Sequence, residues 1–341
     1  MPSVGRRAPA LRSDMTTTTR PARTGALSSR SSQRGIALVL ALWLTVLLTV
    51  IASGFAFSMR SEAVAARNAI SSAQARELAD GAVERAVYEM SRPKLPDTWA
   101  PDGRAHLWTE GGAQLMVTAV DETSKIDLNS ANEALLKGLM VNVGGLDDAA
   151  AARVVDAVID WRDADDLKRP NGAEEADYRA AGLKYGPANA PFESVSEFGR
   201  VLGVTPDLLT RVTPSLTVYS RQAGINPTTA SRDVLLALPV STPETVDRYL
   251  QTRTDAMDAR LPVPFFPPAQ GFGVGAIAVW RIHAEVAMPD GVTFAREAVV
   301  RPAADPRRPL IVLAWLDGAR APVPPPEPAG GTSVNTPKYA R

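Results

Sequence analysis

The chain changes abruptly from basic to apolar residues at Gly35. No charged residue occurs from Gly35 to Met59, and a helix of that length spans the roughly 30 Å hydrocarbon core of a bilayer. After Met59 the chain becomes amphipathic, and apolar residues recur at helical spacing at Ala79, Val83, Val87 and Met90. Pro93 ends this pattern. We therefore predict one continuous helix over about residues 36–91, apolar in its first half and amphipathic in its second.

Alternating apolar and polar positions predict short strands at both ends of the remaining chain. The predicted strands are His106–Trp108, Gln114–Val120, Ala276–Met288, Val292–Val300 and Leu310–Leu316. Glu110-Gly111-Gly112 and Pro289-Asp290-Gly291 are typical of hairpin turns between them. His283 falls on the polar face of its strand, where we expect a solvated side chain. The predicted fold class is α+β: a long N-terminal helix and a small antiparallel sheet, interrupted by a large all-helical insertion.

The insertion contains an internal echo, in which residues 125–136 (KIDLNSANEALL) match residues 224–235 (GINPTTASRDVL). In each copy a pair of short polar residues, Asn129-Ser130 or Thr228-Thr229, is expected to cap the apolar helix that follows. The first copy continues through Gly144-Gly145 into an amphipathic helix over residues 149–161. This order predicts helix-hairpin-helix or SAM-like units. Such hairpins bind DNA phosphates through backbone amides, but Asp147-Asp148 would repel phosphate, so a packing role is favoured.

Charge and composition limit the classes of function that the chain can have. The net charge is zero, yet residues 1–35 carry seven arginines and one aspartate, so the basic charge belongs to a leader and not to a nucleic-acid-binding face. Arginines before an apolar span hold the leader in the cytoplasm and send the remainder outward. The chain has no cysteine and two histidines, His106 and His283, which excludes disulfides and thiol catalysis. No phosphate loop or nucleophile elbow occurs, and we expect no enzymatic activity.

An acidic loop lies between two predicted helices of the insertion. Its seven carboxylates are those of Asp160, Asp163, Asp165, Asp166, Glu174, Glu175 and Asp177. Calcium takes six to eight oxygen ligands in irregular geometry, so this composition indicates a hard-cation site. Asp163, Asp165 and Glu174 fit positions 1, 3 and 12 of an EF-hand count. Leu167 and Lys168 occupy positions 5 and 6 of that count, so the loop is not an EF-hand, and a solvated acidic loop is the alternative.

The N-terminal pattern resembles that of a type IV pilin or a type II secretion pseudopilin. The resemblance rests on Arg34-Gly35 before Ile36, the charge-free run and its amphipathic continuation. The order Asp-Trp-x-Asp-x-Asp, Gly-Ala-Glu-x-x-x-Tyr and then Asn189 and Pro-Phe-Glu-Ser is similar to the minor pseudopilin K family of type II secretion over about residues 35–316. The chain departs from most pilins at Ile36, where they have Phe or Met, and at Leu40, where they have Glu. The missing Glu is a feature of the K pseudopilins.

The resemblance implies a site, partners and a location. A prepilin peptidase would cut between Gly35 and Ile36, and the new N-terminus would be methylated. The implied calcium ligands are Asp163, Asp165, Glu174, Glu175 and Asn189, with Asp160 and Asp177 as flanking candidates. The family sits at the pseudopilus tip with other minor pseudopilins of the I and J types, helping to initiate assembly and the export of folded proteins across the outer membrane. We expect a single-pass protein of the bacterial inner membrane with a periplasmic soluble domain and no nucleic-acid partner.

These inferences divide the chain into six predicted segments. They are a cleaved leader (1–35), a transmembrane segment (36–58), the stem helix with the first strands (59–120), the helical insertion with its acidic loop (121–270), the remaining strands (271–317) and a disordered Pro-rich tail (318–341). Whether Met1 or Met15 is the true start stays open. The alternative functions are a pilin-like DNA-handling protein and a signal-anchored periplasmic hydrolase.

Overall fold

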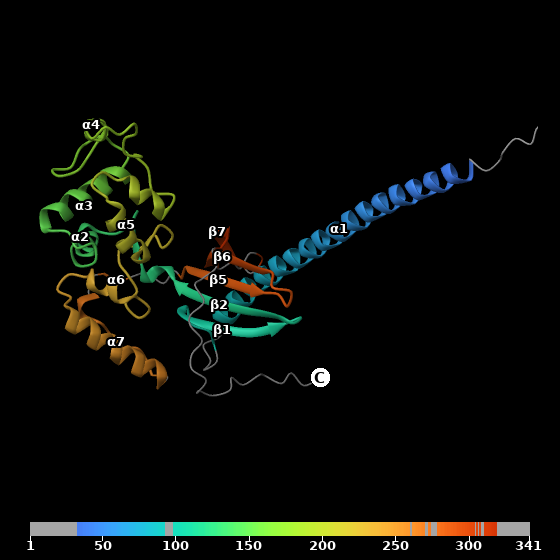
Figure 1. Cartoon of the computed structure of the whole chain (residues 1–341). Coiled ribbons are helices and arrows are strands. Elements are labelled where there is room, and N and C mark those ends of the chain that lie inside the picture. Colours follow the sequence, from blue (N-terminus) through green and yellow to red (C-terminus); the bar gives the residue numbers. More distant parts are fainter. Residues whose placement is uncertain are drawn as a thin grey trace, which may run out of the picture. The chain divides into compact units, whose positions relative to one another are not determined.

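A computed structural model describes residues 33–92, 98–259, 261–269, 272–273, 278–303, 305, 307 and 310–318. Residues 1–32 of the predicted leader and nearly all of the predicted tail lie outside these residues. The chain divides into two compact units, Met1–Ala65 and Ala66–Arg341. Helix α1 (Gln33–Ser91) begins in the first unit and ends in the second (Figure 1). It has 59 residues and confirms the predicted continuous helix.

The first unit consists of the apolar half of α1. Its large apolar side chains are exposed throughout, for example Leu38 at 74% and Trp43 at 70%. Thr45 and Thr49 donate their hydroxyls to the carbonyls of Leu42 and Thr45, at 2.8 and 2.7 Å, which satisfies these polar groups within the helix. In the described part of the chain, α1 is the one helix long and apolar enough to cross a membrane.

The second unit contains a five-stranded antiparallel sheet in the order β1-β2-β5-β6-β7 (Figure 1). Its strands are β1 (Asp102–Glu110), β2 (Ala113–Asp121), β5 (Trp280–Ala287), β6 (Thr293–Pro302) and β7 (Leu310–Asp317). The two predicted hairpin turns are confirmed, because Gly111, Gly112 and Gly291 all have positive φ. The strands are those predicted, and most of them are longer than the pattern indicated.

The second half of α1 packs on one face of this sheet. Its buried face is built from small residues, including Ala75, Ala79, Ala82 and Ala86, which let the helix approach the strands closely. Arg296 of β6 is buried and donates to Asp80 of α1 at 2.6 Å and to Asp317 of β7 at 2.6 Å. This charge-assisted contact fixes the stem against the sheet.

The environment of the His283 side chain differs from the one predicted. It lies in β5, the central strand, opposite Thr118 of β2 and Glu297 of β6. Its side chain is half-buried, and its Nε2 atom is shielded from solvent without a hydrogen-bond partner among the described residues. The expectation of a solvated histidine was therefore wrong, because strands flank β5 on both sides.

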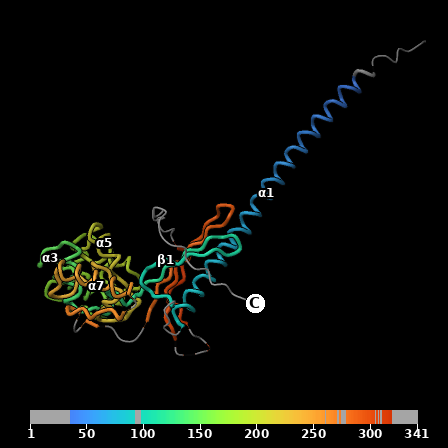
Figure 2. The backbone as a smooth tube through the Cα atoms, turned by 90° about the horizontal axis from the view of Figure 1, so that it is seen from below, coloured from blue at the N-terminus to red at the C-terminus, as the bar shows by residue number. Residues whose placement is uncertain are grey.

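The insertion between β2 and β5 is mainly helical. Its elements are η1 (Glu122–Ser124), β3 (Ile126–Asp127), α2 (Glu133–Asn142), α3 (Asp148–Arg162), α4 (Glu175–Ala180), η2 (Val195–Arg200), α5 (Pro206–Val212), η3 (Thr213–Ser215), β4 (Leu216–Thr217), α6 (Arg232–Leu236), α7 (Pro243–Asp258) and η4 (Pro267–Ala269). Figure 2 shows α3, α5 and α7 gathered in one helical group. The short parallel pair β3–β4 was not predicted from the sequence.

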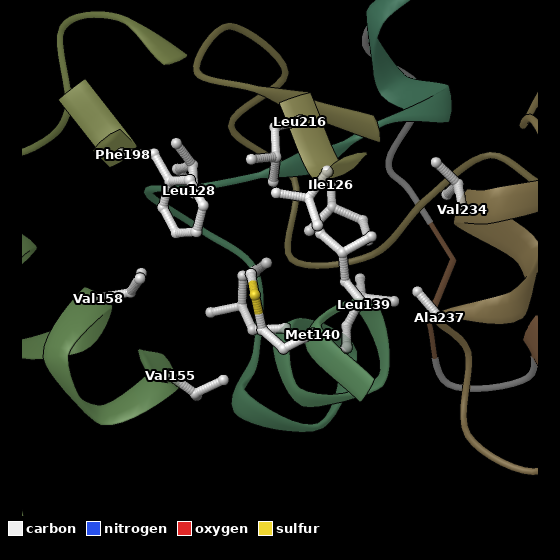
Figure 3. Packing of buried hydrophobic residues seen from close by; sticks show 14 of the residues in the cluster. Ile126, Leu128, Leu139, Met140, Val155, Val158, Phe198, Leu216, Val234 and Ala237 are labelled. Carbon is white, nitrogen blue, oxygen red and sulfur yellow. The ribbon is translucent and has the colours of Figure 1, made fainter. Parts of the chain in front are cut away.

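One apolar core serves the whole insertion. Helices α2 and α3 and strand β4 contribute fully or nearly fully buried side chains such as Leu139, Val158 and Leu216, which converge on the centre of the group in Figure 3. The repeated helices carry the predicted faces, because Leu135 and Leu136 in the first copy and Val234 and Leu235 in the second are buried. The two copies therefore form a single folded body.

The predicted helix caps were wrong by two to three residues in both copies. Helix α2 is capped by Asn132, which accepts from the Leu135 N–H at 2.9 Å, and α6 is capped by Ser231. Asn129 is instead part of a turn, since its N–H donates to Asp127 Oδ1. Its side-chain Nδ2 donates to the Phe192 carbonyl, and its Oδ1 accepts from the Phe192 N–H. Turn-forming and capping residues are chemically alike, so the sequence alone did not separate them.

The insertion is tied to the sheet through Glu122, whose side chain is fully buried. Arg281 of β5 donates its Nε to Glu122 Oε1 at 2.7 Å, and Lys125 Nζ lies at the same distance. Burial raises the pKa of Glu122, but the bonds from Arg281 and Lys125 outweigh it and leave the pKa below the ordinary value. The carboxylate is therefore charged, and its charge is compensated within the junction.

Candidate cation site

The acidic loop runs from the end of α3 to the start of α4. Helix α3 ends at Arg162, after which Asp163 adopts an extended backbone and donates its N–H to the Ile159 carbonyl. An aromatic floor lies beneath the loop, where the Trp161 ring contacts those of Tyr178 and Phe192 at centroid distances of 6.1 and 5.9 Å. The loop therefore rests on a rigid, apolar support.

Two carboxylates of α3 fasten the loop from below. Asp156 accepts from Arg169 Nε at 2.7 Å and from Asn171, and fully buried Asp160 accepts from the Ala173 N–H at 2.8 Å. A Cβ on Gly172 would lie 1.9 Å from Asp160 Oδ2, so only glycine fits there. Burial raises the pKa of Asp160 despite its backbone hydrogen bonds. Asp156 is not among the residues predicted for the site, although its spacing of four residues from Asp160 places both on one helix face.

Three of the predicted ligands each carry an oxygen that is shielded from solvent and has no hydrogen-bond partner among the described residues. These atoms are Asp163 Oδ1, Glu174 Oε1 and Asn189 Oδ1. Buried polar atoms are normally paired, so three orphaned oxygens in one loop need an explanation. Two carboxylate oxygens and one amide oxygen are the donors that a hard cation prefers.

Burial and mutual repulsion both act on the carboxylates of the loop. Burial raises the pKa of Glu174 to about 7, and the negative charges of Asp160, Asp163, Asp166 and Asp165 add to the effect. The pKa of Asp163 is raised as well, first by burial and then by Asp165. Mutual repulsion of this kind is relieved when a cation binds among the groups.

Asn189 is held in place by its backbone and its amide. Its φ of 48° lies in the left-handed region, which asparagine tolerates better than most residues. Its Nδ2 donates to Asp166 Oδ1 at 2.8 Å. Asp165 accepts from the Leu167 N–H with Oδ1 at 2.9 Å. These bonds order the loop around the orphaned oxygens.

Two other predicted residues are engaged elsewhere. Glu175 is exposed on α4 and pairs with Arg179. Asp177 accepts from Lys168 Nζ at 2.6 Å and from the Glu174 N–H at 3.0 Å, and these bonds lower its pKa. Within the residues that the structure describes, no three or more His, Cys, Asp or Glu side chains are grouped closely enough to hold a metal ion. A cation would therefore have to draw the carboxylates of the loop inward.

The hairpin between α2 and α3 bears on the DNA-handling alternative. Asp147 caps α3 by accepting from the Ala150 N–H at 2.7 Å, and Asp148 pairs with Lys137 at 2.9 Å. A carboxylate therefore already occupies the helix N-terminus that a phosphate would need.

A long apolar helix that continues into a small antiparallel sheet defines a pilin-type, membrane-anchored subunit. Residues 115–221 match the family model described as type II secretion system (T2SS), protein K. The chain is 28% identical over 231 residues to the type II secretion system protein K of Klebsiella pneumoniae, covering 60% of this chain and 69% of that protein. It is 27% identical over 225 residues to the protein K of Pectobacterium carotovorum subsp. carotovorum, covering 58% and 67%. The chain is therefore similar to the type II secretion system protein K family, and these matches support a minor pseudopilin of that system.

A solved structure shares the fold. The crystal structure of the GspK-GspI-GspJ complex from enterotoxigenic Escherichia coli contains a chain that matches with a TM-score of 0.54 and 18% identity. The match covers 77% of this chain and 99% of that chain. It confirms the α+β architecture in which a helical insertion interrupts a pilin-type sheet.

Proposed function

We propose that this chain caps the tip of a type II secretion pseudopilus, where it helps to initiate assembly and the export of folded proteins across the outer membrane. The observation that carries the proposal is Leu40, an exposed apolar residue of α1 where most pilins have Glu. No acidic residue occurs between Gly35 and Ser61. A subunit above this chain would find no carboxylate for its charged N-terminus, and an unpaired charge in lipid is costly.

The stem offers a surface to subunits below and beside it. The sheet buries one face of the second half of α1, whereas Ile70 and Tyr88 on that half are 59% and 66% exposed. Exposed apolar residues on a long helix are typical of a helix-packing interface. The partners are other minor pseudopilins of the I and J types, and the fold match to a chain of the GspK-GspI-GspJ complex supports this choice.

The leader is proposed to be removed by cleavage, and α1 is proposed to anchor the mature chain in the membrane. The prepilin peptidase cuts between Gly35 and Ile36, and the new N-terminus at Ile36 is methylated. Residues 1–32 of the leader lie outside the described residues. The arginines before the span place the leader in the cytoplasm, so the sheet and insertion lie in the periplasm and α1 anchors them in the inner membrane.

The acidic loop is proposed to bind calcium. Asp163, Asp165, Glu174 and Asn189 would hold the ion, with the orphaned oxygens of three of them as donors. Glu175 could join only by leaving Arg179, and Asp160 and Asp177 remain in the flanking shell that orders the loop. The bound ion supplies positive charge to a cluster of repelling carboxylates. The proposed role of the ion is structural: by binding among these carboxylates it stabilises the insertion.

Complex formation tests the proposed function. The full-length chain is purified in detergent together with the minor pseudopilins encoded in the same genome, and their affinity is measured by titration. We expect Tyr88→Glu to weaken the complex at least tenfold, since it places a charge on the stem interface. Val240→Glu, at an 87% exposed apolar residue of the insertion, is the matched control and leaves affinity unchanged. The absence of any complex with the wild-type chain would contradict the proposal.

A further inference from the structure

Strand β7 forms one edge of the sheet and presents apolar side chains to solvent. Among the described residues it pairs with β6 on one side and with no strand on the other. Four of its large apolar residues are exposed: Val312 and Leu316 at 53%, Ile311 at 39% and Trp315 at 38%. An unpaired row of backbone donors and acceptors flanked by apolar side chains is a template for another strand.

The opposite edge of the same sheet is protected. Strand β1 carries charged residues at Asp102, Arg104 and Glu110, and Arg104 pairs with Asp102 and with Asp258 of α7. Its pairing with β2 shifts register between Asp102 and Ala105. Charged side chains on an edge strand are a common means by which proteins block strand addition. In β7 the first charged residue is its last, Asp317, so the two edges are built for different purposes.

We propose that β7 is completed by an extended strand of a neighbouring pilin-type subunit. This inference rests on the proposed function, and it adds a sheet-edge contact to the stem contact. The segment that follows β7 is unsuited to the role, because Pro322, Pro324, Pro325, Pro326 and Pro328 lack the N–H groups that a ladder requires. The occupant is therefore a strand of another chain with apolar residues at alternate positions.

The edge is continuous with the stem. Asp317 at the end of β7 is held by Arg296 and lies 3.6 Å from Arg76 of α1. Two adjoining grooves share Thr293 and Phe294. One continues to Ser72 and Arg76 on α1 and the other to Asp317. A subunit that lies along the exposed stem therefore reaches β7 without crossing another element.

A second feature of β7 favours an added strand that carries apolar side chains. The pairing of β6 with β7 shifts register between Val299 and Val300, which leaves Leu313 without an opposite residue. Leu313 lines a groove whose other walls include Phe192 and Tyr219 of the insertion. A side chain of the added strand can be buried there, which gives the contact specificity beyond its backbone hydrogen bonds.

Charged substitutions on the two edges test the inference. Val312→Lys and Leu316→Lys are made in the full-length chain, and binding to the minor pseudopilins of the same genome is titrated in detergent. We expect each to weaken the complex at least tenfold. Leu107→Lys, at a 72% exposed position on β1, is the matched control and binds like the wild type. If the wild type binds and the β7 variants bind equally well, the edge inference is overturned while the proposed function stands. If the wild type forms no complex, both fall.

Crosslinking identifies the occupant even if a lysine variant folds poorly. The chain has no cysteine, so Leu316→Cys provides a unique attachment point for a benzophenone maleimide. Irradiation of the assembled complex should join Leu316→Cys to another pseudopilin, and the same label on Leu107→Cys should not. A crosslink to the tail of the same chain, or to a second copy of it, would overturn the inference.

Discussion

Replacing Glu174 by glutamine should raise stability without calcium and remove most of the stability that calcium adds. The pKa of Glu174 is about 7 in the folded protein, against an ordinary value of 4.5. Between these two pH values the unfolded chain has released this proton and the folded protein retains it, so stability falls as pH rises. At about 1.36 kcal/mol for each pH unit, the loss at pH 8 amounts to about 3 kcal/mol.

Glu174→Gln removes that loss because glutamine has no charge to bury. In chelator at pH 8 the variant should unfold at a higher temperature than the wild type, by about 6–12 °C for a domain of this size. Near pH 4.5 the two should have the same melting temperature. With calcium at a hundred times its dissociation constant, the wild type should gain about 2.7 kcal/mol, and the variant should gain much less because it lacks one charged ligand.

The assay is thermal unfolding of the full-length chain in detergent, from pH 4.5 to 8, in chelator and in calcium. Glu175→Gln is the matched control, because Glu175 is the adjacent residue in the chain yet pairs with Arg179 at the surface. It should leave both the pH dependence and the calcium response unchanged. The reasoning is refuted if the wild type in chelator has the same stability at pH 5 and pH 8, or if Glu174→Gln lowers stability there.

Three further predictions concern other parts of the chain. Val240→Gly should raise the free energy of unfolding by about 1 kcal/mol, because Val240 has a φ of 60°. Relieving the backbone strain at this residue gains about 1–3 kcal/mol, which exceeds the entropic cost of glycine. A lower denaturation midpoint would argue against this prediction. Glu122→Gln should cost roughly 3 kcal/mol in chemical denaturation, because it removes the buried carboxylate that compensates Lys125 and Arg281 together and leaves Arg281 with Glu297 alone. A loss under about 1 kcal/mol would contradict this. The intact mass of the membrane-extracted protein should equal that of a chain that begins at Ile36. A mature chain that retains Arg34 would rule out pilin-type processing.

The sequence predicted the parts of the fold that follow from periodicity. The charge-free run and its amphipathic continuation predicted α1, and alternation predicted the strands of the sheet. The pattern did not reveal β3 and β4, because two-residue strands leave no periodic signal. It also misplaced the caps of α2 and α6, since Asn129 and Thr228 have the same chemistry as the true caps, Asn132 and Ser231.

The candidate site was predictable in composition but not in geometry. Acidic residues at close spacing identified the loop, and the family resemblance selected the ligand set. Which carboxylates face inward depends on their ion pairs. Arg179 holds Glu175 at the surface through a pair four residues apart within α4, and Lys168 holds Asp177 across the loop. The role of Gly172 likewise becomes evident only from its approach to Asp160.

The copy number of this chain in the assembled complex tests the tip assignment most directly. The full-length chain is assembled with the other minor pseudopilins in detergent, and the molar mass of the complex is measured by light scattering, with subunit ratios from quantified gel bands. A subunit that lacks the acidic residue for a neighbour above it should appear once in each complex at every concentration. Homopolymers of this chain, or several copies of it in each complex, would contradict the tip assignment.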